Sequence, residues 1–221
     1  MGLISKLVGK RAKPIETIVA AVSSEQAVTR VMKSLSKGAP AAVAQAGAEI
    51  ATALNTVETA ILAIDTIADL LIEAELLTAT ARDTQSAGRR ALISNRYNKL
   101  LHTVSETILR AEHNGMNLLD GNRSTYEIKL DSDERASIAL HVADLTTQTE
   151  GLGLSTPQEA FASQVEVERT IAEIDAARRT TARVADLFAD SSAVLAERLA
   201  RLDQDFGPDA ARATHPTGAG H

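Results

Sequence analysis

Residues 112–121 read EHNGMNLLDG, a short stretch in which two turn-forming dipeptides enclose a pair of leucines. Asn-Gly and Asp-Gly pairs favour positive φ, a backbone region that glycine enters without steric penalty. The stretch therefore predicts that the chain reverses direction here, and that the two leucines attach the turn to a hydrophobic core. The residues of this turn motif are Asn114, Gly115, Leu118, Leu119, Asp120 and Gly121.

Upstream of the motif, apolar residues recur at alternating spacings of four and three, which is the a/d pattern of a helix that packs along another helix. The pattern predicts a long helix over 42–86 and a second helix over 89–112. It is interrupted near Glu75, where Leu76 and Leu77 restart the apolar face, so we expect a bend or a change of packing partner there. Gly88 is the expected helix stop. The helix-packing seam consists of Ile50, Leu54, Val57, Ile61, Ile64 and Leu71, with Ala68 between the last two.

Downstream of the motif, the apolar period changes from that of a helix to two. Alternating residues on either side of the polar stretch DSDER predict one β-hairpin over 124–142, with one face buried on the helices. A long helical pattern returns over 157–206 and contributes Leu195, Leu199 and Leu202 to the seam, with Phe206 on the same face.

These elements predict a mainly α fold: an elongated antiparallel helical bundle or coiled-coil rod with one small β-hairpin. Aromatic residues make up only 2% of the chain, so the branched aliphatic residues and alanine must fill narrow seams between helices. The expected organisation is a basic leader with a short helix over 1–40, a rod domain over 41–206, and a disordered tail over 207–221.

Composition excludes several classes of protein. The net charge of −6 argues against a general nucleic-acid binder, and the absence of cysteine excludes disulfides and thiolate metal sites. No apolar run approaches the roughly 20 residues that span a bilayer. The basic N-terminal segment resembles a signal peptide only superficially, because Glu16 interrupts its apolar part.

No catalytic, metal or cofactor site is predicted. The five histidines form no HExxH pattern, and the sequence contains neither a Gly-rich phosphate loop nor a GxSxG serine. The stretch from Asp131 begins like a calcium loop, but Ala136 replaces the glycine at position six and Val142 replaces the glutamate at position twelve. We therefore expect no enzymatic activity.

The order of elements around EHNGMNLLDG resembles bacterial flagellin. Members of that family carry a helix that ends in an FNG-x-x-LLDG-like turn, then a β-hairpin and an LGL stretch, here GLGL at 151–154, and His113 replaces the usual aromatic residue. MKSLSKG at 32–38 is similar to the flagellin RLSSG stretch, and the segments around 56–84 and 171–199 are similar to the outgoing and returning rod helices.

The resemblance implies a structural protein that is exported through the flagellar type III apparatus and self-associates with flagellin-like subunits, either its own copies or a paralogue, in an extracellular filament. A flagellar export chaperone is a further implied partner. We expect this chain to lack the C-terminal polymerisation helix and the variable outer domain of the family. The alternative is a non-polymerising helical adaptor that binds flagellin, a chaperone or another helical partner, with a cytoplasmic location.

Overall fold

The structure is a computed structural model that describes residues 14–130 and 136–207. Residues 1–13 of the predicted leader and residues 208–221 of the predicted tail lie outside the described residues. The described chain forms four helices, α1 (Pro14–Gly38), α2 (Ala41–Asp83), α3 (Ala87–Arg110) and α4 (Gln164–Phe206). Its four short strands are β1 (Glu112–His113), β2 (Met116–Asn117), β3 (Thr125–Lys129) and β4 (Ser137–His141).

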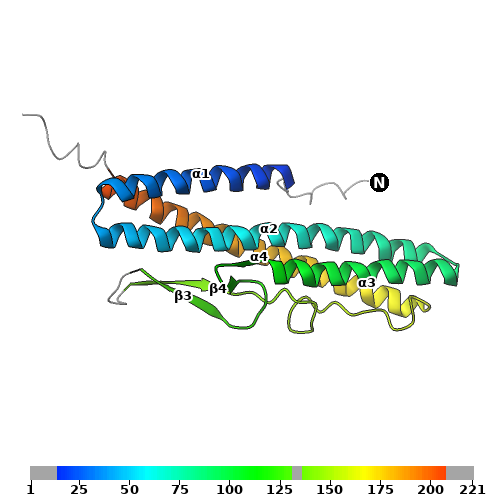
Figure 1. The fold of residues 1–221 in the computed structure, drawn as a ribbon. Helices are drawn as coiled ribbons and strands as arrows, with labels where there is room; N and C mark the ends of the chain where they lie inside the picture. Colours follow the sequence, from blue (N-terminus) through cyan, green and yellow to red (C-terminus); the bar gives the residue numbers. More distant parts are fainter. Residues whose placement is uncertain (1–13, 131–135, 208–221) are drawn as a thin grey trace, which may run out of the picture.

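The helices form an elongated rod, which confirms the predicted mainly α fold (Figure 1). Helices α2 and α4 have 43 residues each, or roughly 65 Å at 1.5 Å per residue, and run antiparallel along most of the molecule. Helix α3 returns beside the C-terminal half of α2, and α1 lies beside its N-terminal half. Helices α2 and α4 thus contact each other along the rod, α1 contacts both of them at one end, and α3 packs on α2 at the other.

The buried face of α2 follows the predicted heptad pattern with two local shifts. Ala60 and Ile67 are fully buried where the neighbouring Ile61 and Ala68 were expected.

The expected break near Glu75 is wrong, because the buried face continues through Ala74, Thr78 and Ala81 to the last turn. Small side chains continue the period there. Leu76, which was expected to restart the face, is 65% exposed.

Three predicted helix boundaries are also corrected. Helix α2 ends at Asp83 rather than 86, and Gly88 lies inside the first turn of α3 rather than at a helix stop. The Ser86 hydroxyl accepts a hydrogen bond from the Arg89 amide (3.4 Å) and so caps the start of α3. Helix α3 ends at Arg110 rather than 112, since the chain turns into β1.

Helix α4 begins at Gln164, seven residues after its predicted start at 157. Ala160 and Phe161 have φ of +53° and +60°, which is incompatible with a right-handed helix. The Ser163 hydroxyl caps the helix by accepting a hydrogen bond from the Glu166 amide (3.2 Å). The first residues of the predicted helix are therefore part of a loop.

The chain forms two hairpins where one was predicted. Strands β3 and β4 form the predicted hairpin, with Ile128 opposite Ile138 and both side chains buried. The second hairpin pairs β1 with β2 about the Asn114-Gly115 turn, in the register His113 to Met116. It has two residues in each strand, too few for a period-two pattern to indicate it in the sequence.

Candidate functional site

The joint between α3 and the hairpins is organised by the side chain of Asn117. Its Nδ2 donates a hydrogen bond to the Ile108 carbonyl (2.7 Å), and its Oδ1 accepts one from the Leu119 amide (2.9 Å). The last carbonyls of a helix lack partners inside the helix, so this amide satisfies one of them while fixing the returning chain. Asn117 is buried at 7% exposure. It matches the flagellin-like turn in sequence, but the sequence did not predict these hydrogen bonds.

Leu118 and Leu119 are fully buried, and their backbone groups tie the joint to the segment after β4. The Leu118 carbonyl accepts a hydrogen bond from the Ala143 amide (2.8 Å), and the Leu119 carbonyl accepts one from the Leu145 amide (3.0 Å). The leucines thus lie in the hydrophobic core while their backbone pairs with the chain that leaves the hairpin.

The other four motif residues shape the two turns. Asn114 and Gly115 are exposed, with φ of +51° and +74°, and close the β1–β2 hairpin. Asp120 accepts a hydrogen bond from the Asn122 amide (3.1 Å), which stabilises the turn that follows. Gly121 has φ of +66°, and a Cβ there would lie 2.6 Å from the Asp144 Cγ. Glycine is required at position 121 both for its dihedral angle and for space.

The predicted helix-packing seam lies within the hydrophobic core of the described rod. The seam of α2 therefore packs against helices of its own chain. Phe206, by contrast, is 42% exposed. The buried seam residues are Ile50, Leu54, Val57, Ile64, Leu71, Leu195 and Leu199, and the partly buried ones are Ile61 and Leu202.

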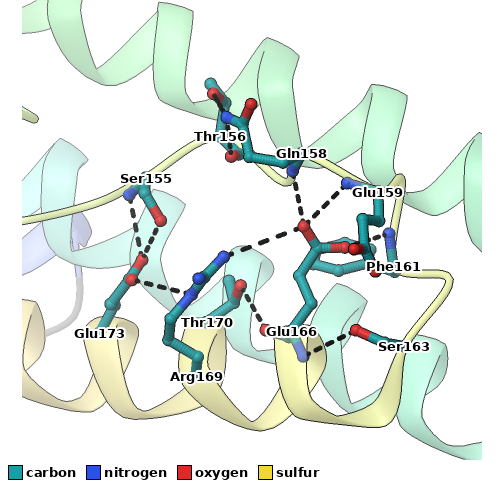
Figure 2. A network of polar contacts seen from close by, with 10 residues as sticks. All are labelled: Ser155, Thr156, Gln158, Glu159, Phe161, Ser163, Glu166, Arg169, Thr170 and Glu173. Carbon is teal, nitrogen blue, oxygen red and sulfur yellow. Dashed lines mark hydrogen bonds and ion pairs between the residues drawn. The ribbon is translucent and has the colours of Figure 1, made fainter.

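A buried carboxylate holds the loop between the hairpin and α4 (Figure 2). Glu166 is 5% exposed, and its Oε1 accepts hydrogen bonds from the Gln158 amide (2.6 Å) and the Glu159 amide (3.0 Å). Its Oε2 accepts a hydrogen bond from the Phe161 amide (2.8 Å). A single side chain in the first turn of α4 therefore satisfies three backbone donors of a loop that contains two positive-φ residues.

A second carboxylate, Glu173, lies about two helical turns further along α4 and extends this network (Figure 2). The Glu173 Oε2 accepts hydrogen bonds from the Ser155 amide (3.0 Å) and hydroxyl (2.7 Å). The Arg169 guanidinium lies between the two carboxylates, at 3.9 Å from Glu166 and 3.7 Å from Glu173. The loop is thus attached to α4 at two points, by the carboxylates of Glu166 and Glu173. The guanidinium of Arg169 lies near both carboxylates.

Phe161 and Tyr97 connect this loop to α3. Their ring centroids are 5.8 Å apart in an edge-to-face arrangement, and both side chains are fully buried. The Tyr97 hydroxyl has no hydrogen-bond partner within the described part of the chain. Burial and, to a lesser extent, the negative charge of Glu173 raise the pKa of the Tyr97 phenol well above its usual range.

One feature of the sequence could have indicated this network. Ser163 and Glu166 have the S-x-x-E spacing of a capping box, which marks the start of a helix. In the usual capping box the glutamate would accept a hydrogen bond from the capping residue's own amide. Here its carboxylate accepts hydrogen bonds from three loop amides instead, so the motif would have located the helix start but not the loop contacts.

The rod surface carries large apolar side chains on α2, α3 and α4. Leu76 of α2, Leu92 of α3 and Val165 of α4 are 65%, 64% and 80% exposed. The polar part of the interface between α2 and α4 contains an ion pair between Arg178 and Glu75. A groove of about 680 Å³ lies between α3 and the loop over 147–158, and polar residues line most of it.

No arrangement suited to metal chemistry occurs among residues 14–130 and 136–207, where no three His, Asp or Glu side chains gather into a possible ligand set. None of the helices described has an apolar stretch long enough to cross a membrane.

The fold defines the class of protein: an elongated helical rod with a hairpin joint between its helices. No family model matches the sequence, and no curated protein matches it. Among solved structures, the chain is similar to the crystal structure of Bacillus cereus flagellin, with a TM-score of 0.51 and 21% identity over 72% of this chain and 85% of that chain. The chain therefore has a flagellin-like fold.

Proposed function

We propose that this chain is a flagellin-like structural protein, a subunit or accessory component of the bacterial flagellar filament. The observation that carries the proposal is the shared order of elements: a long helix, a returning helix, a turn with two buried leucines, a hairpin and a second long helix. The similarity to a solved flagellin, which covers 72% of this chain, supports the same proposal. The implied location is extracellular, after type III export without a cleaved signal.

Association in this proposal uses the exposed side chains of the rod rather than its seam. Leu76 and Leu92 are each more than half exposed and lie on α2 and α3, which pack against one another. We propose that these two exposed apolar side chains are part of the contact with another protein surface. The partners are flagellin-like subunits, either further copies of this chain or a paralogue, and before export a flagellar chaperone.

A second function is favoured by one specific observation. Ile50, Leu54 and Leu71 of the seam are buried within the single chain, so they offer nothing to a second subunit. A chain whose seam residues are already buried by its own helices can act as a non-polymerising helical adaptor that binds flagellin, a chaperone or another helical partner. In that case the cytoplasm is an alternative location.

Sedimentation of the purified protein, with and without flagellin seeds, separates the two functions. The structural proposal predicts pelletable polymers or incorporation onto seeds. The adaptor function predicts monomers that co-sediment with flagellin in a fixed ratio but do not elongate the seeds. If the protein neither self-associates nor co-sediments, and deletion of its gene leaves motility and filament composition unchanged, the flagellar proposal fails.

A matched pair of surface variants tests the proposed association face. Leu76→Glu places a charge on an exposed apolar position of α2, whereas Thr80→Glu places the same charge at an exposed polar position one turn away. We expect the first variant to reduce sedimentation or seed binding by about tenfold and the second to change it little. Equal effects of the two variants would contradict the placement of the interface.

A further inference from the structure

Helix α4 carries a stripe of exposed side chains along the face opposite its buried residues. Successive members of the stripe are three or four residues apart, which places them on one side of the helix. Buried residues such as Thr181 and Phe188 lie on the other side. The stripe consists of Ala176, Arg179, Arg183, Asp186, Asp190 and Val194, all of them exposed.

The stripe divides into a basic half and an acidic half. Arg179 and Arg183 are four residues apart, and so are Asp186 and Asp190, and like charges at this spacing destabilise a helix. Among the described residues none of these four charges forms an ion pair, although Arg183 donates a hydrogen bond to the Thr180 hydroxyl (3.3 Å). Each half therefore carries an electrostatic cost that an oppositely charged surface would offset.

The order of the charges is self-complementary in one orientation. A second copy of α4 is laid antiparallel, with a twofold axis midway between Arg183 and Asp186. Arg183 is then level with the partner's Asp186, and Arg179 is level with the partner's Asp190, because both pairs are centred on the same point. A parallel copy in register would instead place arginine beside arginine and aspartate beside aspartate.

The apolar side chains fit the same arrangement. A groove of about 500 Å³ lies on the basic half, where the small side chains of Ala176 and Thr180 lie beside the arginines. On the acidic half, Leu187 and Val194 are 44% and 49% exposed. The twofold axis that pairs the charges brings the partner's Val194 level with Ala176, and the partner's Leu187 within one turn of Thr180. Large apolar side chains of each copy thus face the groove of the other.

We propose that α4 forms a twofold-symmetric antiparallel pair with α4 of a second copy of this chain. The contact extends from Ala176 to Val194, which is roughly 27 Å of helix, and such a contact closes on itself. Other occupants match half of the stripe at most. A nucleic acid or an acidic helix would pair with the arginines but would be repelled by Asp186 and Asp190, and a basic helix would meet the reverse.

This pair does not rest on the flagellar proposal, whose association face contains Leu76 of α2 and Leu92 of α3. Analytical ultracentrifugation measures it in the supernatant after any polymers have been pelleted. Protein concentrations run from about 10 µM to about 1 mM, because a contact the size of one helix pair is weak. We expect a monomer–dimer equilibrium, and Leu76→Glu should leave it unchanged.

Charge reversal tests the pairing of the two halves. The double variant Arg179→Asp/Arg183→Asp makes the whole stripe acidic, and Asp186→Arg/Asp190→Arg makes it basic. We expect each alone to weaken the dimer by at least about tenfold, and a mixture of the two to restore it, because opposite charges then meet at every position. The control Arg96→Asp/Lys99→Asp changes the net charge of the chain as the first variant does, at exposed positions of α3, and should have little effect.

Disulfide cross-linking tests the orientation. The chain contains no cysteine, so introduced cysteines react without background. Ala176→Cys mixed with Val194→Cys should form a disulfide between copies under mild oxidation. Neither variant should do so alone, because the antiparallel pair separates equal positions by roughly 27 Å along the helix.

A wild-type protein that stays monomeric at the highest concentration would overturn the proposal. So would a dimer that survives both charge reversals, or a mixture that fails to restore it although circular dichroism shows both variants folded. If either reversal fails to fold, the cysteine variants decide, and a disulfide between two copies of Ala176→Cys would show a parallel pair and overturn the arrangement. Polymers that pellet, or their absence, affect none of these outcomes, so failure here is distinct from failure of the flagellar proposal.

Discussion

At the scale of single residues, the two glycines Gly121 and Gly88 have opposite requirements. Gly121 has positive φ and no room for a Cβ beside Asp144, whereas a Cβ at Gly88, in the first turn of α3, would meet nothing within 4 Å. We expect Gly121→Ala to lower the free energy of unfolding by about 2 kcal/mol and Gly88→Ala to raise it by about 0.5 kcal/mol. Urea unfolding measures both, and a destabilising Gly88→Ala would contradict the helical placement of Gly88.

The raised pKa of Tyr97 predicts a pH dependence of stability. The folded state retains a phenol proton that the unfolded state releases above about pH 10. The associated stabilisation is therefore complete below that pH and is lost as the pH rises toward the folded-state pKa, at up to about 1.4 kcal/mol per pH unit.

Tyr97→Phe isolates this effect, because it keeps the ring contact with Phe161 and removes a hydroxyl that has no described partner. We expect the variant to lose less stability than the wild type between pH 8 and pH 11 in urea unfolding experiments. Parallel decreases in the two proteins would contradict the assignment of the alkaline loss to Tyr97.

Residue chemistry that is local in sequence could be predicted, and chemistry that depends on tertiary contacts could not. The glycines of EHNGMNLLDG were predicted to adopt positive φ, and Gly115 and Gly121 do so because their neighbours in sequence determine the turn. The hydrogen bonds of Asn117 were not predicted, since they depend on the Ile108 carbonyl, which the folded joint brings within 2.7 Å of its side chain.

At the scale of elements, the loop before α4 depends on the Glu166 carboxylate. Glu166→Gln keeps one acceptor oxygen but places an amide NH₂ where backbone N–H groups point, so at least one buried donor loses its partner. We expect a decrease of about 2 kcal/mol in the free energy of unfolding, and faster protease cleavage within 155–161. Glu168→Gln, an exposed position on the same helix, serves as the control and should change neither quantity.

The packing of α2 gives a prediction about its two kinds of leucine. Leu54 is 1% exposed in the seam, whereas Leu76 is 65% exposed, although the apolar pattern of the sequence treats both as packing residues. We expect Leu54→Ala to cost about 3 kcal/mol and Leu76→Ala less than about 0.5 kcal/mol, measured by chemical denaturation. Similar costs would show that the seam shifts toward Leu76 after all.

Most elements were predictable because their periodicities are long and regular, as in the heptads of α2 and the alternation of β3 and β4. The errors have a common cause. Ala74, Thr78 and Ala81 continue the buried face without large apolar side chains, and the positive φ of Ala160 and Phe161 breaks a helical pattern without glycine or proline. Neither feature gives a hydrophobic signal in the sequence.

At the scale of the whole molecule, α2 and α4 make the two ends of the rod depend on one another. Leu199 of α4 lies near Gly47 together with Leu35 of α1. Ile174 of the same helix is buried and follows Glu173, which lines the groove beside α3. Unfolding either end exposes one half of a helix whose other half is still packed. The absence of a boundary in either long helix therefore favours unfolding of the rod as one cooperative unit.

Alanine substitutions at Ile174 and Leu199 test this cooperativity. The two residues lie roughly 38 Å apart along α4 and share no contact, so each substitution should cost about 3 kcal/mol and the costs should add within about 0.5 kcal/mol. We expect a single melting transition in each variant and in the double variant, followed by circular dichroism, with hydrogen exchange accelerated along both ends. Val165→Ala, at an 80% exposed position, is the control. Two melting transitions, or faster hydrogen exchange confined to the mutated end, would show that the two ends unfold independently. In that case α2 and α4 would not couple the unfolding of one end to that of the other.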